Sequence, residues 1–443
     1  SSDLDFALKL SLLKEGKTLA KTLLGASGSG ITDLDWLDKV ALNGKITIKD
    51  SAMSANLTGG VNSAKMNVDS AMTEEAICLR SPELNKKYIS LPSSFLSAIS
   101  GMDVGKIVKT YSEYLAAVPN AQVIGAEIQK YRDVYLKYAT DVSKNSTTVT
   151  KAGYSQDFTV LTVNFEGENA RNLVKEVLTV IKNDDVIKNF LVAMGNFQNS
   201  VNPYGKENFV WEKFMEKVDE LLEDMDEYGL GDFSNIQMDV FVDSKDEICG
   251  RAFRLAEKEV ASFVLTKDGK NFGFDMGVNV DGSLFGITGS GKCSGSIYNG
   301  EYTLSENSNE LQKFTLEGFD AKAAKKGIVK GKLSLVPESP QLSAFKFALN
   351  FDLGNTEQKY GFAVQQDSKT LATADYSTKL LKASTIKLPS DAVSVESEAD
   401  IQEYVKSLKF DNLNSIIKKV GLPKEIEGTL TDSVDMMAKS LTE

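Results

Sequence analysis

The sequence predicts an α+β protein of two tandem units, each a curved, half-barrel-like antiparallel sheet with helices packed on one face. Over most of residues 236–388 large apolar residues occupy every second position, which is typical of strands with one buried face. Within residues 103–142 and 169–228 apolar residues recur every three or four positions, as in amphipathic helices. Two near-copies of one phrase, KKYISLPSSFL at residues 86–96 and ASTIKLPSDAV at residues 383–393, indicate a repeated unit.

The first unit is expected to cover residues 1–232, because 443 residues exceed one ordinary domain. Residues 4–25 are ambiguous: Leu4 to Leu12 alternate like a strand, while Leu12, Leu19 and Leu23 suit a helix, and a mostly helical segment is the favoured interpretation. The remaining elements are expected to be an antiparallel meander at 41–91, helices at 103–142, strands at 147–165 and helices at 169–228.

Two helices of this unit have clear apolar stripes, and each stripe is expected to be buried. The first stripe contains Ile124, Ile128, Tyr131, Tyr135, Tyr138 and Val142. The second contains Trp211, Phe214, Val218, Leu221 and Met225, with acidic residues on the opposite side of the helix.

The second unit is expected to cover residues 233–443, with a sheet at 236–388 and helices at 398–440. Runs such as NFGFDMGVNV and FKFALNF predict a sheet with one face buried (dry) and the other exposed to solvent (wet). About ten antiparallel strands are expected, and open twisted sheets of that size curl, so the sheet is predicted to be curved or partly closed.

The two LPS phrases, at residues 91–93 and 388–390, favour an architectural interpretation over a binding motif. In each copy a strand is expected to end at the proline, which lacks an N–H for the ladder, and a helix to begin behind a Ser or Asp cap. Ser397 and Asp400 have capping-box spacing.

Composition excludes several classes of function. A formal net charge of −12 disfavours binding to nucleic acid or anionic lipid headgroups. Without histidine, and with Cys78, Cys249 and Cys293 widely spaced, no metal site is expected. Both a Cys249–Cys293 disulfide and three free thiols remain open. No apolar run approaches the roughly 20 residues of a membrane-spanning helix, and the start SSDLDF is expected to be that of a mature or trimmed chain.

Motifs that resemble catalytic or cofactor sites do not predict an enzyme or a cofactor. GITGSGKC at residues 286–293 resembles a phosphate-binding loop, but a strand is expected to follow it, so a bend or bulge is favoured. DMDEYGLGDF at 224–233 resembles a calcium loop but lacks two ligands. The SxxK pairs at residues 11–14 and 415–418 lack the companion motifs of serine hydrolases that use lysine.

Aromatic residues of the second sheet are the candidate binding site. If helices cover their face fully, it is a core; if helices leave a gap, it binds an apolar ligand, and the core is the favoured interpretation. The residues expected to contact such a ligand are Phe272, Phe274, Phe345, Phe347 and Phe362.

The I-x-L-P-S corners at residues 89–93 and 386–390, the meanders before them and the lack of histidine carry a resemblance. The chain resembles extracytoplasmic lipoproteins of Gram-positive gut bacteria of the Firmicutes type, which are distantly similar to the half-barrel lipoprotein and lipid carriers of the LolA and LprG type. The resemblance implies a non-catalytic protein outside the cell, held at the membrane by an N-terminal lipid, with a lipid or lipopeptide as ligand. The alternative expectation is a cell-surface scaffold or adhesin that binds a protein or glycan.

Overall fold

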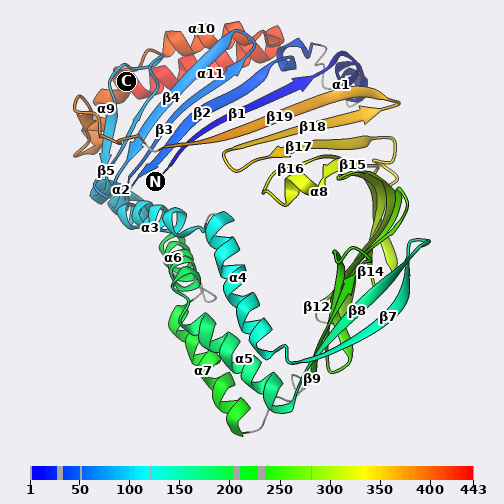
Figure 1. Cartoon of the computed structure of the whole chain (residues 1–443). Coiled ribbons are helices and arrows are strands. Elements are labelled where there is room, and N and C mark those ends of the chain that lie inside the picture. Colours follow the sequence, from blue (N-terminus) through cyan, green and yellow to red (C-terminus); the bar gives the residue numbers. More distant parts are fainter. Residues whose placement is uncertain are drawn as a thin grey trace. The chain divides into compact units, whose positions relative to one another are not determined.

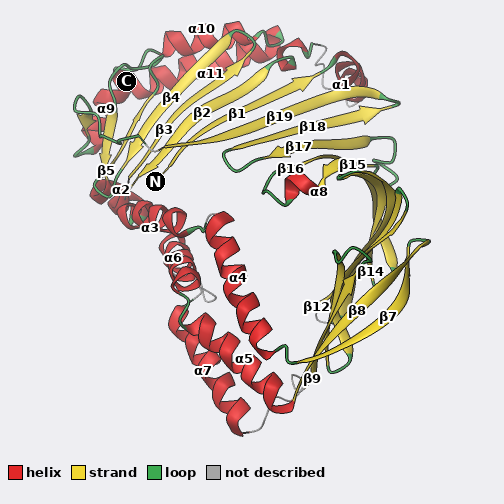
Figure 2. Ribbon diagram, viewed as in Figure 1, coloured by secondary structure: helices red, strands yellow, loops and turns green. Residues whose placement is uncertain are grey.

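The structure is a computed structural model that describes residues 2–26, 33–49, 52–119, 121–202, 210–227, 235–280, 282–382 and 384–442. These residues form twenty strands and eleven α-helices (Figures 1 and 2). The prediction of an α+β chain with curved antiparallel sheets is confirmed.

The chain divides into two compact units that alternate along the sequence. Unit 1 comprises Ser1–Val118, Ala193–Asn208 and Phe351–Glu443, and unit 2 comprises Pro119–Val192 and Phe209–Asn350. The expected boundary at residues 232 and 233 lies outside the described residues. Each of the expected halves, 1–232 and 233–443, contributes to both units.

The sheet of unit 1 is formed by both ends of the chain. Its strands pair in the spatial order β18, β19, β1, β2, β3, β4, β5, β6, β20, and every pair is antiparallel except β6–β20. The strands are β18 (Glu357–Gln366), β19 (Lys369–Lys382), β1 (Ser2–Leu12), β2 (Val40–Lys49), β3 (Ala52–Val61), β4 (Ala64–Met72), β5 (Ala76–Arg80), β6 (Ile89–Pro92) and β20 (Val393–Ser394).

The prediction of a mostly helical segment at residues 4–25 is wrong for its first half. Residues Ser2–Leu12 form β1, and only Lys14–Ala26 form a helix, α1. β1 hydrogen-bonds to β19 on one side and to β2 on the other, so Phe6 lies between Thr378 and Gly44. Hydrogen bonding to both neighbouring strands favours the extended conformation of residues 2–12. In a strand, the alternating apolar residues of this segment all lie on one face of the sheet.

Helices of unit 1 cover the polar face of this sheet. Figure 1 shows α10 (Phe410–Val420) and α11 (Lys424–Thr442) along one face of β1–β4. That face carries Asp69 and Arg80, which form an ion pair of 2.7 Å. Tyr404 of α9 (Glu398–Lys406) is buried within reach of the Arg80 charge and donates a hydrogen bond to the Lys87 carbonyl.

The first LPS phrase ends a strand and starts a helix as predicted: β6 ends at Pro92, and α2 (Ser93–Ser100) follows directly. The expected Ser or Asp cap is wrong for α2, whose N-cap is Pro92 without a side-chain hydrogen bond. Asp103 then caps α3 (Val104–Ala117) by accepting from the backbone N–H of Lys106. The second phrase does not end a strand. β19 ends at Lys382, and residues 384–389 have no regular structure.

The capping box of Ser397 and Asp400 at the start of α9 is confirmed. Before it, the short strand β20 pairs in parallel with Ile89 and Ser90 of β6. The two corner segments therefore lie side by side in unit 1. The expectation that they end equivalent strands is wrong for the second copy, because β20 forms three residues after its LPS phrase.

The sheet of unit 2 follows the order of the sequence from β7 to β16. The strands are β7 (Asp141–Lys151), β8 (Tyr154–Glu166), β9 (Asn235–Val242), β10 (Ile248–Leu255), β11 (Lys258–Asp268), β12 (Asn271–Val280), β13 (Ser283–Ser294), β14 (Ile297–Glu306), β15 (Asn309–Asp320) and β16 (Val329–Leu335). Each strand is antiparallel to the next. The connection from β8 to β9 is long and contains helices, whereas the other connections are short. A short helix, α8 (Ala321–Ala324), precedes β16, and the boundary between the units falls within β17 (Lys346–Leu353).

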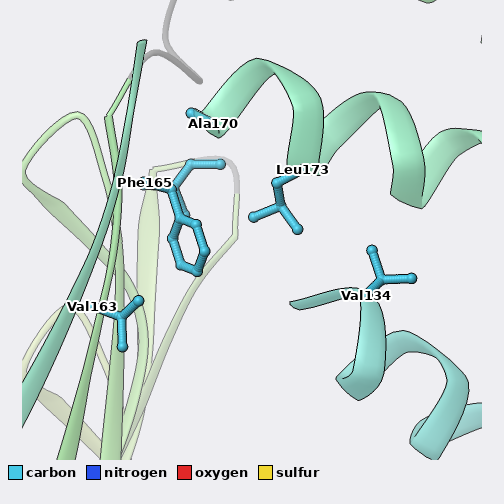
Figure 3. Close-up of a cluster of buried hydrophobic side chains, with 6 residues drawn as sticks. Val134, Val163, Phe165, Ala170 and Leu173 are labelled. Atoms are coloured by element: carbon cyan, nitrogen blue, oxygen red, sulfur yellow. The ribbon is translucent and has the colours of Figure 1, made fainter. Parts of the chain in front are cut away.

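Helices cover one end of the unit 2 sheet. The connection from β8 to β9 contains α5 (Gly167–Lys182), α6 (Asp185–Val201) and α7 (Trp211–Glu227), and α4 (Ala121–Tyr138) precedes β7. Figure 3 shows Val134 of α4 and Leu173 of α5 facing Val163 and Phe165 of β8. Phe165 is fully buried there.

The sheet of unit 2 curls onto its other face. Phe158 and Val160 of β8 form a second buried cluster with Cys249 and Val264. The end of β7 also reaches β12, where Lys151 of β7 forms an ion pair with Asp275. The prediction of one dry and one wet face is therefore wrong at this end, because curvature buries both faces.

The two predicted helical stripes differ in outcome. In α7, Trp211, Val218 and Met225 are buried, as expected, although Leu221 is exposed. In α4, Ile124 and Ile128 are 45% and 65% exposed, so burial of the whole first stripe is wrong. Only the C-terminal half of α4 packs against the sheet, through Val134 and its neighbours.

Candidate ligand-binding site

One face of the unit 2 sheet carries the predicted aromatic residues. Phe263 is paired with Met276, and Met276 with Ile287, while Val278 is paired with Phe285. Since side chains alternate along each strand, these residues share a face. We call it the apolar face of unit 2; its large members are Phe253, Phe263, Phe272, Phe274, Met276, Phe285, Tyr302 and Phe314.

The helices leave part of this face uncovered. α4 and α5 pack near Phe253 and Leu255. Farther along the sheet Phe263, Met276 and Phe285 are 37%, 39% and 40% exposed. The favoured interpretation of the face as a fully covered core is therefore wrong for these strands.

Beside the exposed residues lies a packed aromatic cluster. The rings of Phe272 and Tyr298 are 5.2 Å apart and steeply inclined, and Tyr302 stacks on Phe314 at 5.4 Å. A Cβ atom at Gly300 would lie 2.9 Å from the Phe272 ring, so glycine allows the ring to lie flat on β14. Burial raises the pKa of Tyr302 to about 12. This cluster is a rigid core next to the open part of the face.

The five predicted site residues fall in different places. Phe272 is fully buried in β12, and Phe274 is half-buried; both contact the ring of Tyr302. Phe345 precedes β17 and Phe347 lies within it, and both are half-buried. Phe362 lies in β18 and belongs to unit 1, where it is 39% exposed.

Unit 1 also has an apolar face. The sequence does not predict it, because a mostly helical segment is expected at residues 4–25, whereas residues 2–12 form a strand of this sheet. Leu8 of β1 is paired with Leu42 of β2 and with Tyr376 of β19, and these side chains share a face. Six large apolar residues of this face are between 37% and 52% exposed: Leu10, Leu42, Val68, Phe362, Tyr376 and Leu380. They define the apolar face of unit 1.

The polar face of unit 1, beneath the helices, holds a buried carboxylate. Asp3 is 1% exposed and forms an ion pair of 2.5 Å with Lys45. It also accepts hydrogen bonds from the backbone N–H and the hydroxyl of Ser384. Burial favours the neutral acid, but these contacts outweigh it and hold the pKa of Asp3 well below its usual value.

The motifs that resemble catalytic or cofactor sites lie in ordinary elements. GITGSGKC lies within β13, whose register with β12 and β14 is unbroken. Of the expected bend or bulge, the bulge is therefore wrong. A Cβ at Gly289 would lie 2.3 Å from the Tyr302 ring. Close packing against this ring therefore explains why the motif has a glycine at position 289. The calcium-like motif lies partly outside the described residues, beyond α7.

Three further features concern metal, sulfur and membrane chemistry. In the described part of the chain, no three Cys, Asp or Glu side chains form a group that could hold a metal ion. Cys249 and Cys293 are free thiols, and burial raises the pKa of Cys249. Among the described helices none is long and apolar enough to span a membrane.

Comparisons of the chain with protein-family models, with curated protein sequences and with solved structures find no match.

Proposed function

We propose that the protein is a non-catalytic binding protein that holds a lipid or another apolar ligand on the apolar faces of its sheets. The observation that carries the proposal is in unit 1: six large apolar side chains on one face are at least 37% exposed, while the helices α9–α11 pack on the opposite face. Contiguous exposed apolar surface of this kind marks a binding site for an apolar ligand or partner.

The dimensions of this face suit an acyl chain. One row of paired residues crosses six strands: Met66, Gly59, Leu42, Leu8, Tyr376 and Tyr360. At about 4.8 Å per strand the row is about 24 Å long. One acyl chain spans about half of a bilayer core of about 30 Å. A single acyl chain, at about 15 Å, would therefore lie within the row and cover part of it. Because these side chains are already partly buried, each would contribute less than the roughly 1.5–3 kcal/mol of a fully exposed side chain.

The proposal includes the location that the resemblance implies, which is outside the cytoplasm and tethered by an N-terminal lipid. A hydrophobic signal that ends in a small-residue-plus-cysteine motif in the upstream gene sequence would support this location. An upstream sequence without such a signal would contradict it. Lipid binding itself is tested separately, on the purified protein.

The first prediction concerns Leu42→Glu. A carboxylate in the middle of the row should remain hydrated and repel an acyl chain, so affinity for a fluorescently labelled phospholipid should fall at least about tenfold. Fluorescence titration measures the affinity, and native mass spectrometry of gently purified protein measures co-purified lipid.

Asn43→Glu is the matched control, because Asn43 is the next residue of β2, exposed on the opposite face. It should bind the phospholipid as the unmodified protein does. Wild-type protein that carries no lipid and binds no labelled phospholipid would contradict the proposal. So would equal loss of binding in both variants.

A further inference from the structure

Unit 2 contains a groove of about 700 Å³ on the face opposite its apolar face. Its floor is formed by β13–β16, where Ser290 is paired with Glu301, Glu301 with Thr315, and Thr315 with Ser334. The turn at Ala152 forms one wall, and the segment from Pro337 to Lys346 contributes the other. Every lining residue belongs to unit 2, and the volume lies within the usual range of small-ligand sites.

The lining of this groove is rich in hydroxyl groups. Six of them come from Thr288, Ser290, Thr303, Thr315, Ser334 and Ser343. We call the site the hydroxyl groove. In a ligand site, several hydroxyls in two adjacent rows can each donate and accept hydrogen bonds, which suits a ligand with many hydroxyls of its own.

Two of these hydroxyls lack a hydrogen-bond partner in the protein. Ser334 is 2% exposed, and both its Oγ and the Oγ1 of its neighbour Thr315 are buried and unpaired. Buried polar groups are almost always paired, because an unpaired one loses its hydration without compensation. The pair therefore leaves two unmet hydrogen-bonding groups at the floor of the groove, which a polar ligand would satisfy once the two side chains turn toward it.

The charges around the groove favour a neutral ligand. Glu301 and Glu338 balance Lys313 and Lys346, and Lys313 is already paired with Glu310 at 2.8 Å. An anionic ligand would need an excess of cationic side chains. Val336 and Pro337 add apolar surface beside the hydroxyls, as needed to contact the C–H faces of a sugar ring.

We propose that the hydroxyl groove binds a neutral saccharide, with Thr315 and Ser334 hydrogen-bonding to its hydroxyl groups. This site lies on the opposite face of the unit 2 sheet from the apolar face. The inference does not rest on the proposed lipid binding, and each can fail without the other.

The test is isothermal titration calorimetry of the full chain with five probes. Three are neutral: maltotetraose, cellotetraose and chitotetraose. The comparison probes are tetragalacturonate, which is anionic, and tetraalanine, a peptide. At least one neutral tetrasaccharide should bind, and more tightly than either comparison probe.

Two variants locate the binding. Ser334→Ala should weaken saccharide affinity about 3- to 10-fold, the size of one neutral hydrogen bond, without lowering Tm, because the lost hydroxyl has no partner in the protein. Thr288→Trp should abolish binding, since an indole at this exposed position fills the groove. Ser262→Ala is the control, because Ser262 lies in β11, outside the groove, and is hydrogen-bonded to Glu259.

The following results would overturn the inference: no neutral saccharide binds; tetragalacturonate or tetraalanine binds more tightly than any saccharide; or Thr288→Trp and Ser262→Ala bind equally well. If Ser334→Ala fails to fold, the Thr288→Trp result alone decides.

Discussion

At the scale of single residues, Asp3 joins segments that are far apart in the sequence. Its carboxylate contacts Lys45 of β2 and Ser384, which follows β19, so one buried side chain ties three segments together. Removing one partner of a buried ionic pair usually costs more than the pair contributes, since the remaining charge is left unpaired. Here Lys45 is 40% exposed, so water can partly compensate.

Asp3→Asn should lower the free energy of unfolding by about 1–3 kcal/mol at neutral pH. The folded-state pKa of Asp3 is lowered, so its stabilisation is fully present above the unfolded-state pKa of about 3.9 and is lost as pH falls through the folded-state value. Denaturant unfolding at pH 7, 5 and 3 should show a constant difference between wild type and variant at the two higher values and a smaller one at pH 3.

Asp5→Asn is the control for this experiment, because Asp5 lies on the same strand and the same face and is half-buried. It should change stability by less than about 0.5 kcal/mol. An Asp3→Asn variant as stable as the wild type at pH 7 would show that the buried carboxylate is not stabilising.

At the scale of secondary-structure elements, periodicity located most helices and strands. The meander expected at 41–91 corresponds to β2–β6, and the sheet expected at 236–388 corresponds to β9–β19, which end at Lys382. These elements could be predicted because burial of one face leaves a local pattern of period two or 3.6. The pattern does not say which faces are covered, so the exposure of Ile128 in α4 was missed.

The α4 helix allows a direct comparison of its exposed and buried residues. Ile128→Gln should change the free energy of unfolding by less than about 0.5 kcal/mol, since an exposed Ile is replaced by a good helix former. Val134→Ala should cost about 2 kcal/mol, because Val134 packs against Phe165 in the core of unit 2. Chemical denaturation measures both. Equal effects would mean that the N-terminal half of α4 is buried in solution.

The position of β1 and the hydroxyl groove could not be predicted, and for the same reason. Ser290, Thr315 and Ser334 are ordinary polar positions of alternating strands, and only their register brings them into one row. β1 pairs with residues near position 378, and no local pattern encodes a partner so distant. The aromatic residues were found because each strand carries its own alternation, although Phe362 belongs to the other unit.

At the scale of the whole molecule, each unit contains residues from both halves of the sequence. Unit 1 depends on β1 as its central link, because β1 is hydrogen-bonded to β19 on one side and to β2 on the other. Unit 2 has its own core around Phe165 and a second cluster around Phe158. The two units are therefore expected to respond differently to damage in β1.

Phe6→Pro should disrupt both ladders of β1, since proline lacks an N–H and fixes φ. Hydrogen-exchange mass spectrometry should show faster exchange in both β2 and β19, which are more than 300 residues apart, and unchanged protection in β12–β14 of unit 2. Phe6→Leu is the control and should leave β2 and β19 protected. Loss of protection in β2 alone would contradict the pairing of β1 with β19.

The pairing of β1 with β19 also sets the order in which a ribosome can complete the two units. About 360 residues separate the end of β1 from the start of β19, which takes about 20–70 s at roughly 5–20 residues per second. During that interval the nascent β1–β2 pair has an open edge with unpaired amides, which is the kind of edge that joins other chains. All segments of unit 2 emerge before β19 does, so β1 is the strand that would most need a chaperone to shield its open edge.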